Sequence, residues 1–207
     1  PVTNTMLEVA TSSNLWVNLF IMVLCAPVAE ELIFRKLLID RLAQYGEGVA
    51  VLFSGLMFGL FHGNLNQFVY AFVLGLCFGF IYVKTGNIRY TIGLHMLVNF
   101  LGSVLGVAIL KWLGDDFLSI ASDPAGMMSY MTGNFGKLIV YFIYIFLLLG
   151  VAIAGIILFI VNLKKIRFLP GMNTLPKGKR FSTTVLNVGM ALYMIVWIVI
   201  IIVQLFQ

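Results

Sequence analysis

The stretch LWVNLFIMVLCAPVAEELIFRKLLI, residues 15–39, decides the fold class of this chain. It is long enough to cross a bilayer as a helix, which takes about 20 predominantly apolar residues. Two adjacent carboxylates, Glu30 and Glu31, interrupt it, and Arg35 follows four residues after the second. A charged side chain inside such a segment is costly unless it is paired or faces water. The two carboxylates therefore mark a candidate functional site inside a membrane helix.

Composition places the whole chain in the membrane class. Hydrophobic residues make up 61% of its 207 residues and charged residues only 10%, with a mean hydropathy of +1.05, whereas a soluble domain carries about 25% charged residues. We therefore expect an all-α, polytopic transmembrane helix bundle in one integral-membrane domain, residues 1–207. About six membrane helices are predicted, at roughly residues 15–40, 48–62, 65–83, 89–110, 138–163 and 182–206.

The distribution of Lys and Arg predicts a topology. If the six segments alternate, 11 of the 13 basic residues fall on one side of the membrane, and such an excess marks the cytoplasmic side. Segment 114–136 is then an external loop, the basic loop 164–180 lies at the cytoplasmic surface beside anionic lipid, and both ends of the sequence face outward. A net charge of +5 arranged in this way does not indicate a nucleic-acid partner. We expect a multi-pass protein of a bacterial cell membrane and, since residue 1 is Pro rather than Met, a fragment or a processed chain.

The two glutamates are predicted to have different environments. Glu31 and Arg35 are four residues apart, so they can form an ion pair on one face of a helix. Adjacent helical residues diverge by about 100°, which leaves Glu30 on another face and available as a general base. The alternative is a solvated helix end, where both carboxylates face water.

Both histidines of the chain, His62 and His95, lie in apolar segments. Phe58 precedes His62 by one turn and can pack against its ring. Asn99 shares a helix face with His95, and their side chains can together donate hydrogen bonds to one oxyanion. The structural alternatives are a satisfied core histidine for His62 and an interhelical polar contact for the His95–Asn99 pair.

The two cysteines, Cys25 and Cys77, also lie in apolar runs. Neither has an imidazole partner at a suitable spacing, so we do not expect a thiol nucleophile. They are predicted to be small core residues rather than a disulfide.

The polar sets together resemble the CPBP family, which contains type II CAAX prenyl endopeptidases and bacteriocin-processing (Abi) membrane proteases. They stand in the order of the family's motifs, EExxxR as Glu30-Glu31…Arg35, FxxxH as Phe58…His62 and HxxxN as His95…Asn99. The resemblance covers about residues 20–105, within a predicted catalytic core of about 15–110. The helices at 138–163 and 182–206 carry no motif.

The resemblance implies an intramembrane glutamate-type endopeptidase that hydrolyses a peptide bond near the membrane. In the family's pattern, Glu30 and His62 activate the attacking water, and His95 and Asn99 stabilise the oxyanion. The supporting residues are Glu31, Arg35 and Phe58. The implied partners are the lipid bilayer and a peptide or membrane-protein substrate, either lipidated, as with a prenylated C-terminus, or carrying a leader peptide.

Both the chemistry and the class of function have alternatives. No cofactor is expected, because Asn99 is a poor zinc ligand and a good oxyanion donor, yet Glu30, His62 and His95 would make a three-ligand zinc site with water in the fourth position. The other functions are a zinc-dependent variant of the protease, a non-catalytic membrane immunity or signalling scaffold with the same fold, and a proton-coupled transporter, since intramembrane Glu and His also relay protons.

The short second helix sets a geometric condition on the site. Residues 48–61 number only 14 before His62, which fits either a short tilted helix or a helix that stops inside the protein. At about 1.5 Å per residue, His62 lies roughly 22 Å along its helix from Glu47, and His95 only about 11 Å from the start of its helix. The catalytic interpretation requires the two imidazoles to meet, and it fails if they lie far apart.

Overall fold

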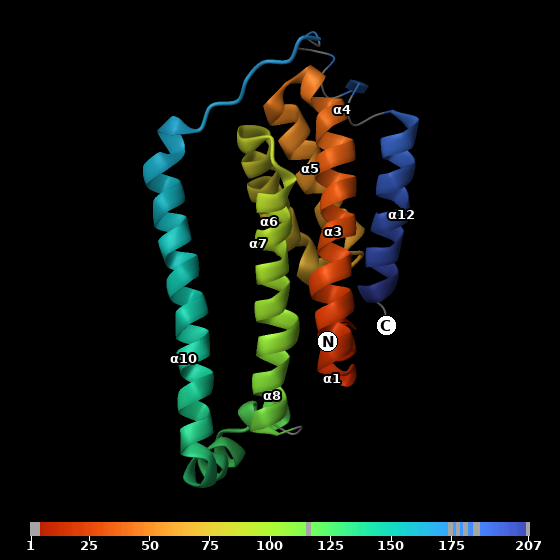
Figure 1. Cartoon of the computed structure of the whole chain (residues 1–207). Coiled ribbons are helices and arrows are strands. Elements are labelled where there is room, and N and C mark those ends of the chain that lie inside the picture. Colours follow the sequence, from red (N-terminus) through yellow and green to blue (C-terminus); the bar gives the residue numbers. More distant parts are fainter. Residues whose placement is uncertain are drawn as a thin grey trace.

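A computed structural model shows a bundle of long helices (Figure 1) and describes residues 5–114, 117–173, 176, 179, 182–183 and 187–205. The first spanning helix, Leu15–Tyr45, follows the short helix α1 (Thr5–Ser12). Its successive segments are α2 (Leu15–Val17), η1 (Asn18–Cys25), α3 (Ala26–Glu31), η2 (Leu32–Ile39), α4 (Asp40–Leu42) and η3 (Ala43–Tyr45). Segments η1 and η2 have the wide π-helical turn, which is frequent at functional sites. Both glutamates lie in α3, between these two segments.

The next two helices, α5 (Glu47–Phe61) and α6 (Leu65–Thr85), form a hairpin. Gly63 in the connection takes a positive φ of 59°, and the Asn64 side chain caps α6 by accepting a hydrogen bond from the N–H of Asn66 (2.8 Å). Gly63 and Asn64 are both buried. Of the two alternatives for the short helix, the structure therefore shows the second, a helix that stops inside the protein.

Glycines bring the two hairpin helices close together. A Cβ on Gly75 of α6 would lie 2.8 Å from the Cα of Gly55 of α5, which is closer than any real side chain atom approaches a backbone carbon. Small residues at such contacts let membrane helices pack backbone against backbone. This contact fixes the position of α6 relative to α5.

We expect Gly75→Ala to lower the free energy of unfolding by about 1–3 kcal/mol, because the added methyl group overpacks the helix contact. Thermal unfolding of the purified protein in detergent, followed by circular dichroism, measures the change. Gly150→Ala is the matched control, since a Cβ at Gly150 meets nothing within 4 Å and Ala favours the helix. An equal loss of unfolding free energy in both variants would contradict the importance of the Gly55–Gly75 contact.

The third long helix, Ile88–Leu113, starts after a sharp turn. Gly86 ends α6 with a φ of 63°, and the Asn87 side chain caps the next helix by accepting a hydrogen bond from the N–H of Arg89 (3.0 Å). The segments of this helix are α7 (Ile88–Asn99), η4 (Phe100–Gly106) and α8 (Val107–Leu113). The helix predicted at 89–110 is thus found close to its predicted bounds.

The segment after the third long helix corrects the predicted external loop at 114–136. Helix α9 (Phe117–Ala121) and the first part of α10 (Pro124–Asn162) occupy most of it. A kink at Asn134 (φ −128°, ψ 24°) separates that first part from the helix predicted at 138–163, which is found close to its predicted start. The Asp123 carboxylate accepts hydrogen bonds from two N–H groups of the first turn of α10 (3.1 and 3.0 Å). An acidic cap followed by Pro is a helix start signal, and hydropathy alone does not register it.

The prediction of six membrane helices was also wrong. Within the described residues, four helices are long and apolar enough to cross a membrane. They are Leu15–Tyr45, Leu65–Thr85, Ile88–Leu113 and Pro124–Lys165, the last including η5 (Leu163–Lys165). Helices α5 and α12 (Val188–Leu205) are apolar but shorter. Of the helix predicted at 182–206, residues 184–186 and 206 lie outside the described part of the chain.

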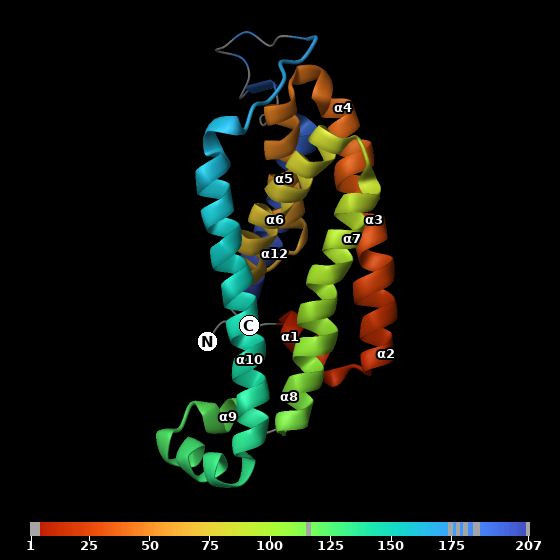
Figure 2. The same cartoon turned by 60° about the vertical axis from the view of Figure 1, so that its left-hand side comes forward.

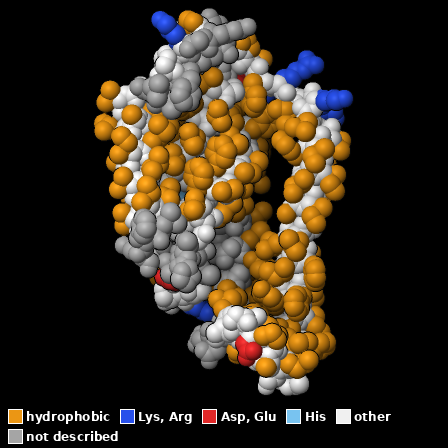
Figure 3. All heavy atoms as spheres, turned by 180° about the vertical axis from the view of Figure 1, so that it is seen from behind, with side chains coloured by type: hydrophobic (Ala, Val, Ile, Leu, Met, Phe, Trp, Pro, Cys, Tyr) orange, Lys and Arg blue, Asp and Glu red, His pale blue; other side chains and the backbone are white. Residues whose placement is uncertain are grey.

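Helix α10 stands apart from the other helices over much of its length (Figures 1 and 2). Its contacts with the bundle are concentrated near its first half, where Tyr144 Oη donates a hydrogen bond to the Leu101 carbonyl (2.8 Å) and Leu138 packs with Leu113 and Phe117. The space-filling view shows an opening between α10 and the rest of the molecule (Figure 3). The compact part of the bundle therefore consists of the N-terminal helices together with α12.

The lateral surface is apolar, with Lys and Arg side chains gathered at the end where α10 finishes (Figure 3). Cys25 and Cys77 are free and lie exposed on the surface, so their predicted place in the core was wrong. Lipid tails are as apolar as a protein core, and an apolar residue of a membrane helix is equally suited to either environment. Which end of the bundle faces the cytoplasm stays a prediction.

Residues 166–173 lie against the start of α5. The Glu47 carboxylate accepts a hydrogen bond from the Leu169 N–H (2.9 Å) and another from the Lys84 ammonium, while the Glu47 N–H donates to the Leu169 carbonyl (3.1 Å). Burial opposes ionisation of Glu47, but the Lys84 and Leu169 hydrogen bonds outweigh it and hold the pKa of this carboxyl below its ordinary value. This segment thereby ties the end of α10 to the N-terminal helices.

Candidate active site

Glu31 and Arg35 form an ion pair in the interior of the bundle. Arg35 Nε lies 3.1 Å from Glu31 Oε2, and both side chains are 0% exposed. The guanidinium carbon also lies 4.5 Å from the ring centre of Phe58 and 5.4 Å from that of Phe78, contacts that favour a desolvated cation. The predicted pairing across one helical turn is confirmed, and the alternative of a solvated helix end is wrong.

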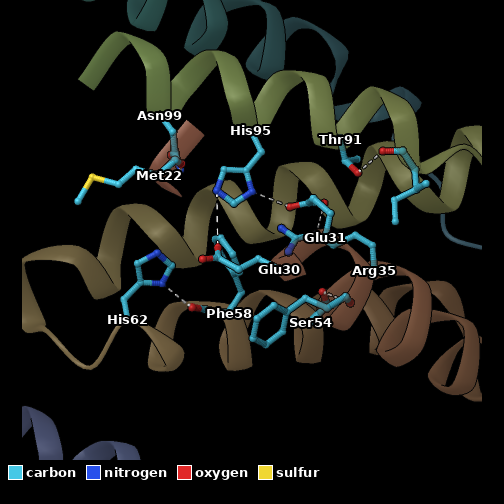
Figure 4. A network of polar contacts seen from close by, with 12 residues as sticks. Met22, Glu30, Glu31, Arg35, Ser54, Phe58, His62, Thr91, His95 and Asn99 are labelled. Carbon is cyan, nitrogen blue, oxygen red and sulfur yellow. Dashed lines mark hydrogen bonds and ion pairs between the residues drawn. The ribbon is translucent and has the colours of Figure 1, made fainter. Parts of the chain in front are cut away.

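His95 lies between the two glutamates (Figure 4). Its Nδ1 is 2.9 Å from Glu31 Oε1, and its Nε2 is 3.7 Å from Glu30 Oε2. The Glu31 carboxylate therefore contacts Arg35 through one oxygen and His95 through the other. A carboxylate on one ring nitrogen fixes the orientation of an imidazole and leaves the second nitrogen for chemistry. In this site the second nitrogen is Nε2, on the side of Glu30.

Glu30 differs from its neighbour as the helical geometry predicts. Its side chain is 18% exposed, whereas that of Glu31 is fully buried. Its Oε2 has no hydrogen-bond partner in the described part of the chain. Glu31 thus belongs to the interior ion pair, and Glu30 presents an oxygen that accepts no hydrogen bond from the described residues.

His62 caps the end of α5. Its Nδ1 lies 2.8 Å from the Phe58 carbonyl oxygen, and since that oxygen only accepts, Nδ1 carries the proton that is donated. Nε2 of the neutral ring is then free to act as a base. The hydrogen bond also folds the ring back along α5, toward Phe58.

The Phe58 ring contacts both imidazoles. Its centre lies 4.9 Å from that of the His62 ring and 5.6 Å from that of the His95 ring, so both histidines pack against one aromatic side chain. The predicted difference in depth is reduced because side chains of a helix point toward its N-terminus, which places the His62 ring beside Phe58 rather than beside the connection.

Asn99 anchors α7 to the first helix. Its Nδ2 donates a hydrogen bond to the Met22 carbonyl (2.7 Å), and its own carbonyl accepts one from Ser103 Oγ (2.6 Å). The predicted interhelical polar contact is therefore present. It does not exclude the predicted role with His95, because Asn99 also lines the cavity described next.

One cavity of about 410 Å³ contains all four predicted catalytic side chains. They are Glu30, His62, His95 and Asn99. The opposite wall comes from α6, where Gln67, Tyr70 and Leu74 recur at helical spacing. Sequence reasoning missed this wall, although a glutamine inside an apolar helix was a signal that could have found it.

The alternative zinc site has a suitable set of donors, one carboxylate and two imidazoles. The three side chains line one cavity, but they are too far apart to share one ion. No three His, Cys, Asp or Glu side chains within the described residues are close enough to hold one metal ion. Both Nδ1 atoms are also engaged, that of His62 by Phe58 and that of His95 by Glu31. We therefore assign no step to a metal.

Comparison with known proteins finds a family match within the N-terminal half of the chain. Residues 12–101 match the Rce1-like type II CAAX prenyl endopeptidase family. This Rce1-like region contains all three motifs, and the match confirms the resemblance predicted from them. A stretch of 74 residues is 32% identical to the Bacillus subtilis (strain 168) protein named "Putative membrane peptidase YdiL". It covers 35% of this chain and 30% of that relative. No solved structure gives a significant match.

The Rce1-like region and the four long apolar helices make this an integral, multi-pass membrane protein. The region ends within η4, so α10 and α12 lie outside it. The four predicted catalytic residues and the three supporting residues all lie inside it. The chain spans less than a third of the relative named above.

Proposed function

We propose that the protein is an intramembrane endopeptidase that hydrolyses a peptide bond with a water activated by Glu30 and His62. A membrane protease is supported by the Rce1-like region and by the name of the bacterial relative. The observation that carries the proposal is the convergence of Glu30, His62, His95 and Asn99 on one cavity.

The attacking water is placed between Glu30 and His62. No hydrogen bond or ion pair joins these two side chains in the described residues, so both remain able to bind one shared water. Glu30 Oε2, 3.7 Å from His95 Nε2, has no hydrogen-bond partner among the described residues, and His62 presents Nε2. As the water oxygen bonds to the scissile carbonyl carbon, its proton passes to the carboxylate. The same proton then goes to the leaving nitrogen as the C–N bond breaks.

The oxyanion of the tetrahedral intermediate is assigned to His95 and Asn99. With Nδ1 held by Glu31 at 2.9 Å, a protonated His95 ring directs its Nε2–H into the cavity. The Asn99 amide carries a second N–H bond, besides the one that the Met22 carbonyl accepts. Preorganised donors of this kind typically account for a hundredfold or more in rate.

Glu31 and Arg35 are positioning residues in this mechanism. The Arg35 guanidinium balances the Glu31 carboxylate, and Glu31 in turn orients His95. Because neither side chain is exposed, neither is expected to touch the substrate. Phe58 supports both imidazole rings from one side.

The substrate class follows from the family and from the cavity. The family model describes a prenyl endopeptidase, and the cavity offers apolar side chains such as Met22, Leu74 and Val98 beside the polar ones. We therefore propose a peptide with a lipidated C-terminus as the first candidate and a leader-type peptide as the second.

The proposal is tested with purified protein in liposomes and three fluorogenic probes. These are a farnesylated CAAX-type peptide, the same peptide without the farnesyl group, and a leader-type peptide. Cleavage by the wild type and its loss in Glu30→Gln and in His62→Ala support the proposal. Cleavage that persists in both variants, or no cleavage of any probe, contradicts it.

We expect a zinc chelator to leave the cleavage rate unchanged within twofold, because the three candidate ligands line one cavity but are not close enough to hold one metal ion in the described part of the chain. The rate is measured before and after dialysis against the chelator. Loss of activity that is restored by added zinc would overturn the metal-free mechanism and support the zinc-dependent variant.

A further inference from the structure

Gln67 is a buried polar side chain whose amide oxygen is unpaired among the described residues. It is 4% exposed, and its Oε1 has no hydrogen-bond partner in the described part of the chain. A buried amide oxygen left unpaired typically costs about 1–3 kcal/mol. Most buried polar groups are paired, so an exception calls for an explanation.

The side chain lines the same cavity as the candidate catalytic residues. It lies in the first turn of α6, five residues after His62 in the sequence, across the connection between the two helices. Tyr70, Ala71 and Leu74 follow it on the cavity wall, and of these only Tyr70 carries a polar atom outside the backbone, so a carboxamide stands at the beginning of a largely apolar face.

The Gln67 carboxamide is not needed to hold the hairpin. The connection is already stabilised by the Asn64 cap on α6 and by the backbone bond from Gln67 N–H to the Asn64 carbonyl (3.2 Å). An apolar residue would fill the same space without an unpaired oxygen. The position is therefore unfavourable for the fold unless a ligand completes it.

We propose that Gln67 is a substrate-binding residue whose carboxamide pairs with a peptide group of the substrate beside the cleaved bond; the inference rests on the proposed function. A carboxamide has both a donor and an acceptor, as a peptide group has, so the two can exchange a pair of hydrogen bonds. A prenyl or acyl chain has neither. Gln67 thus recognises the polypeptide part of the substrate, and the apolar wall is left for its lipid part.

The inference is tested with Gln67→Leu and with the probe that the wild type cleaves fastest. We expect kcat/KM to fall about tenfold, mostly through KM, as for a lost substrate hydrogen bond. N-methylation of the probe, one peptide nitrogen at a time around the cleaved bond, removes one donor. At one peptide nitrogen, methylation should lower kcat/KM of the wild type about tenfold and leave kcat/KM of Gln67→Leu almost unchanged. Thermal stability of Gln67→Leu should be equal or higher, because an unpaired buried oxygen is removed.

Asn66→Leu is the matched control, since Asn66 immediately precedes Gln67 in α6, is exposed and does not line the cavity. It should cleave every probe as the wild type does. If the wild type cleaves and Gln67→Leu matches it, or if every N-methyl group affects both proteins equally, this inference fails and the proposed function stands. If the wild type cleaves no probe, the proposed function itself fails and takes this inference with it.

Discussion

Replacing Glu30 by Gln is expected to lower kcat by about a thousandfold, within the range for loss of a positioned general base. The amide keeps the size of the side chain but cannot take up the proton of the attacking water. Glu30 makes no hydrogen bond through Oε2, so the fold should tolerate the change. Single-turnover cleavage of the best probe in liposomes, with protein in excess, measures the chemical step directly.

Glu8→Gln provides the matched control, since the same chemical change is made at an exposed carboxylate of α1. It should retain the wild-type rate. A Glu30→Gln variant that cleaves within tenfold of the wild type, with unchanged thermal unfolding, would remove Glu30 from the mechanism. A cellular phenotype that survives Glu30→Gln would favour the scaffold function instead.

Replacing Arg35 by Leu is expected to lower the free energy of unfolding by about 3–5 kcal/mol, the usual cost of leaving one member of a buried ion pair alone. Arg35 is fully buried against Glu31 and two aromatic rings, so water does not compensate the stranded carboxylate. Thermal unfolding in detergent, followed by circular dichroism, measures the loss. The double variant Glu31→Leu/Arg35→Leu should recover much of it, because no charge remains unpaired.

The double variant separates stability from function. It should fold but cleave poorly, since His95 loses the carboxylate that holds its Nδ1. Lys36→Leu serves as the control, because its ion pair with Asp40 has the same i,i+4 spacing but is exposed, at 57% and 43%, and such pairs contribute less than about 1 kcal/mol. Equal losses from Arg35→Leu and Lys36→Leu would contradict the importance of burial.

The helical class and the membrane location could be predicted from the sequence because both depend on composition summed over long segments. The Glu31–Arg35 pair could also be predicted, since a spacing of four residues on one helix determines which side chains meet. The separation of Glu30 from Glu31 followed from the same geometry. These are local relations, and they hold whatever the rest of the chain does.

Contacts between side chains of different helices could not be predicted in the same way. That Glu31 contacts His95 depends on how the first and third long helices pack, and the sequence contains no distance between them. The exposed positions of Cys25 and Cys77 could not be predicted in this way either. Hydropathy measures how apolar a residue is, but it does not distinguish lipid from protein core. Gln67 was missed because it belongs to no motif.

Helix α12 covers the connection between α5 and α6, a role that its own sequence does not indicate. A backbone turn at membrane depth cannot face lipid, because each unpaired peptide group there costs several kcal/mol. Trp197 and Ile200 of α12 lie against Gly63 in this turn, and Tyr193 donates a hydrogen bond to the Met57 carbonyl (2.7 Å). Helix α12 therefore shields the turn from lipid. The polar interior of the Rce1-like region thus depends on a helix that lies outside the family match.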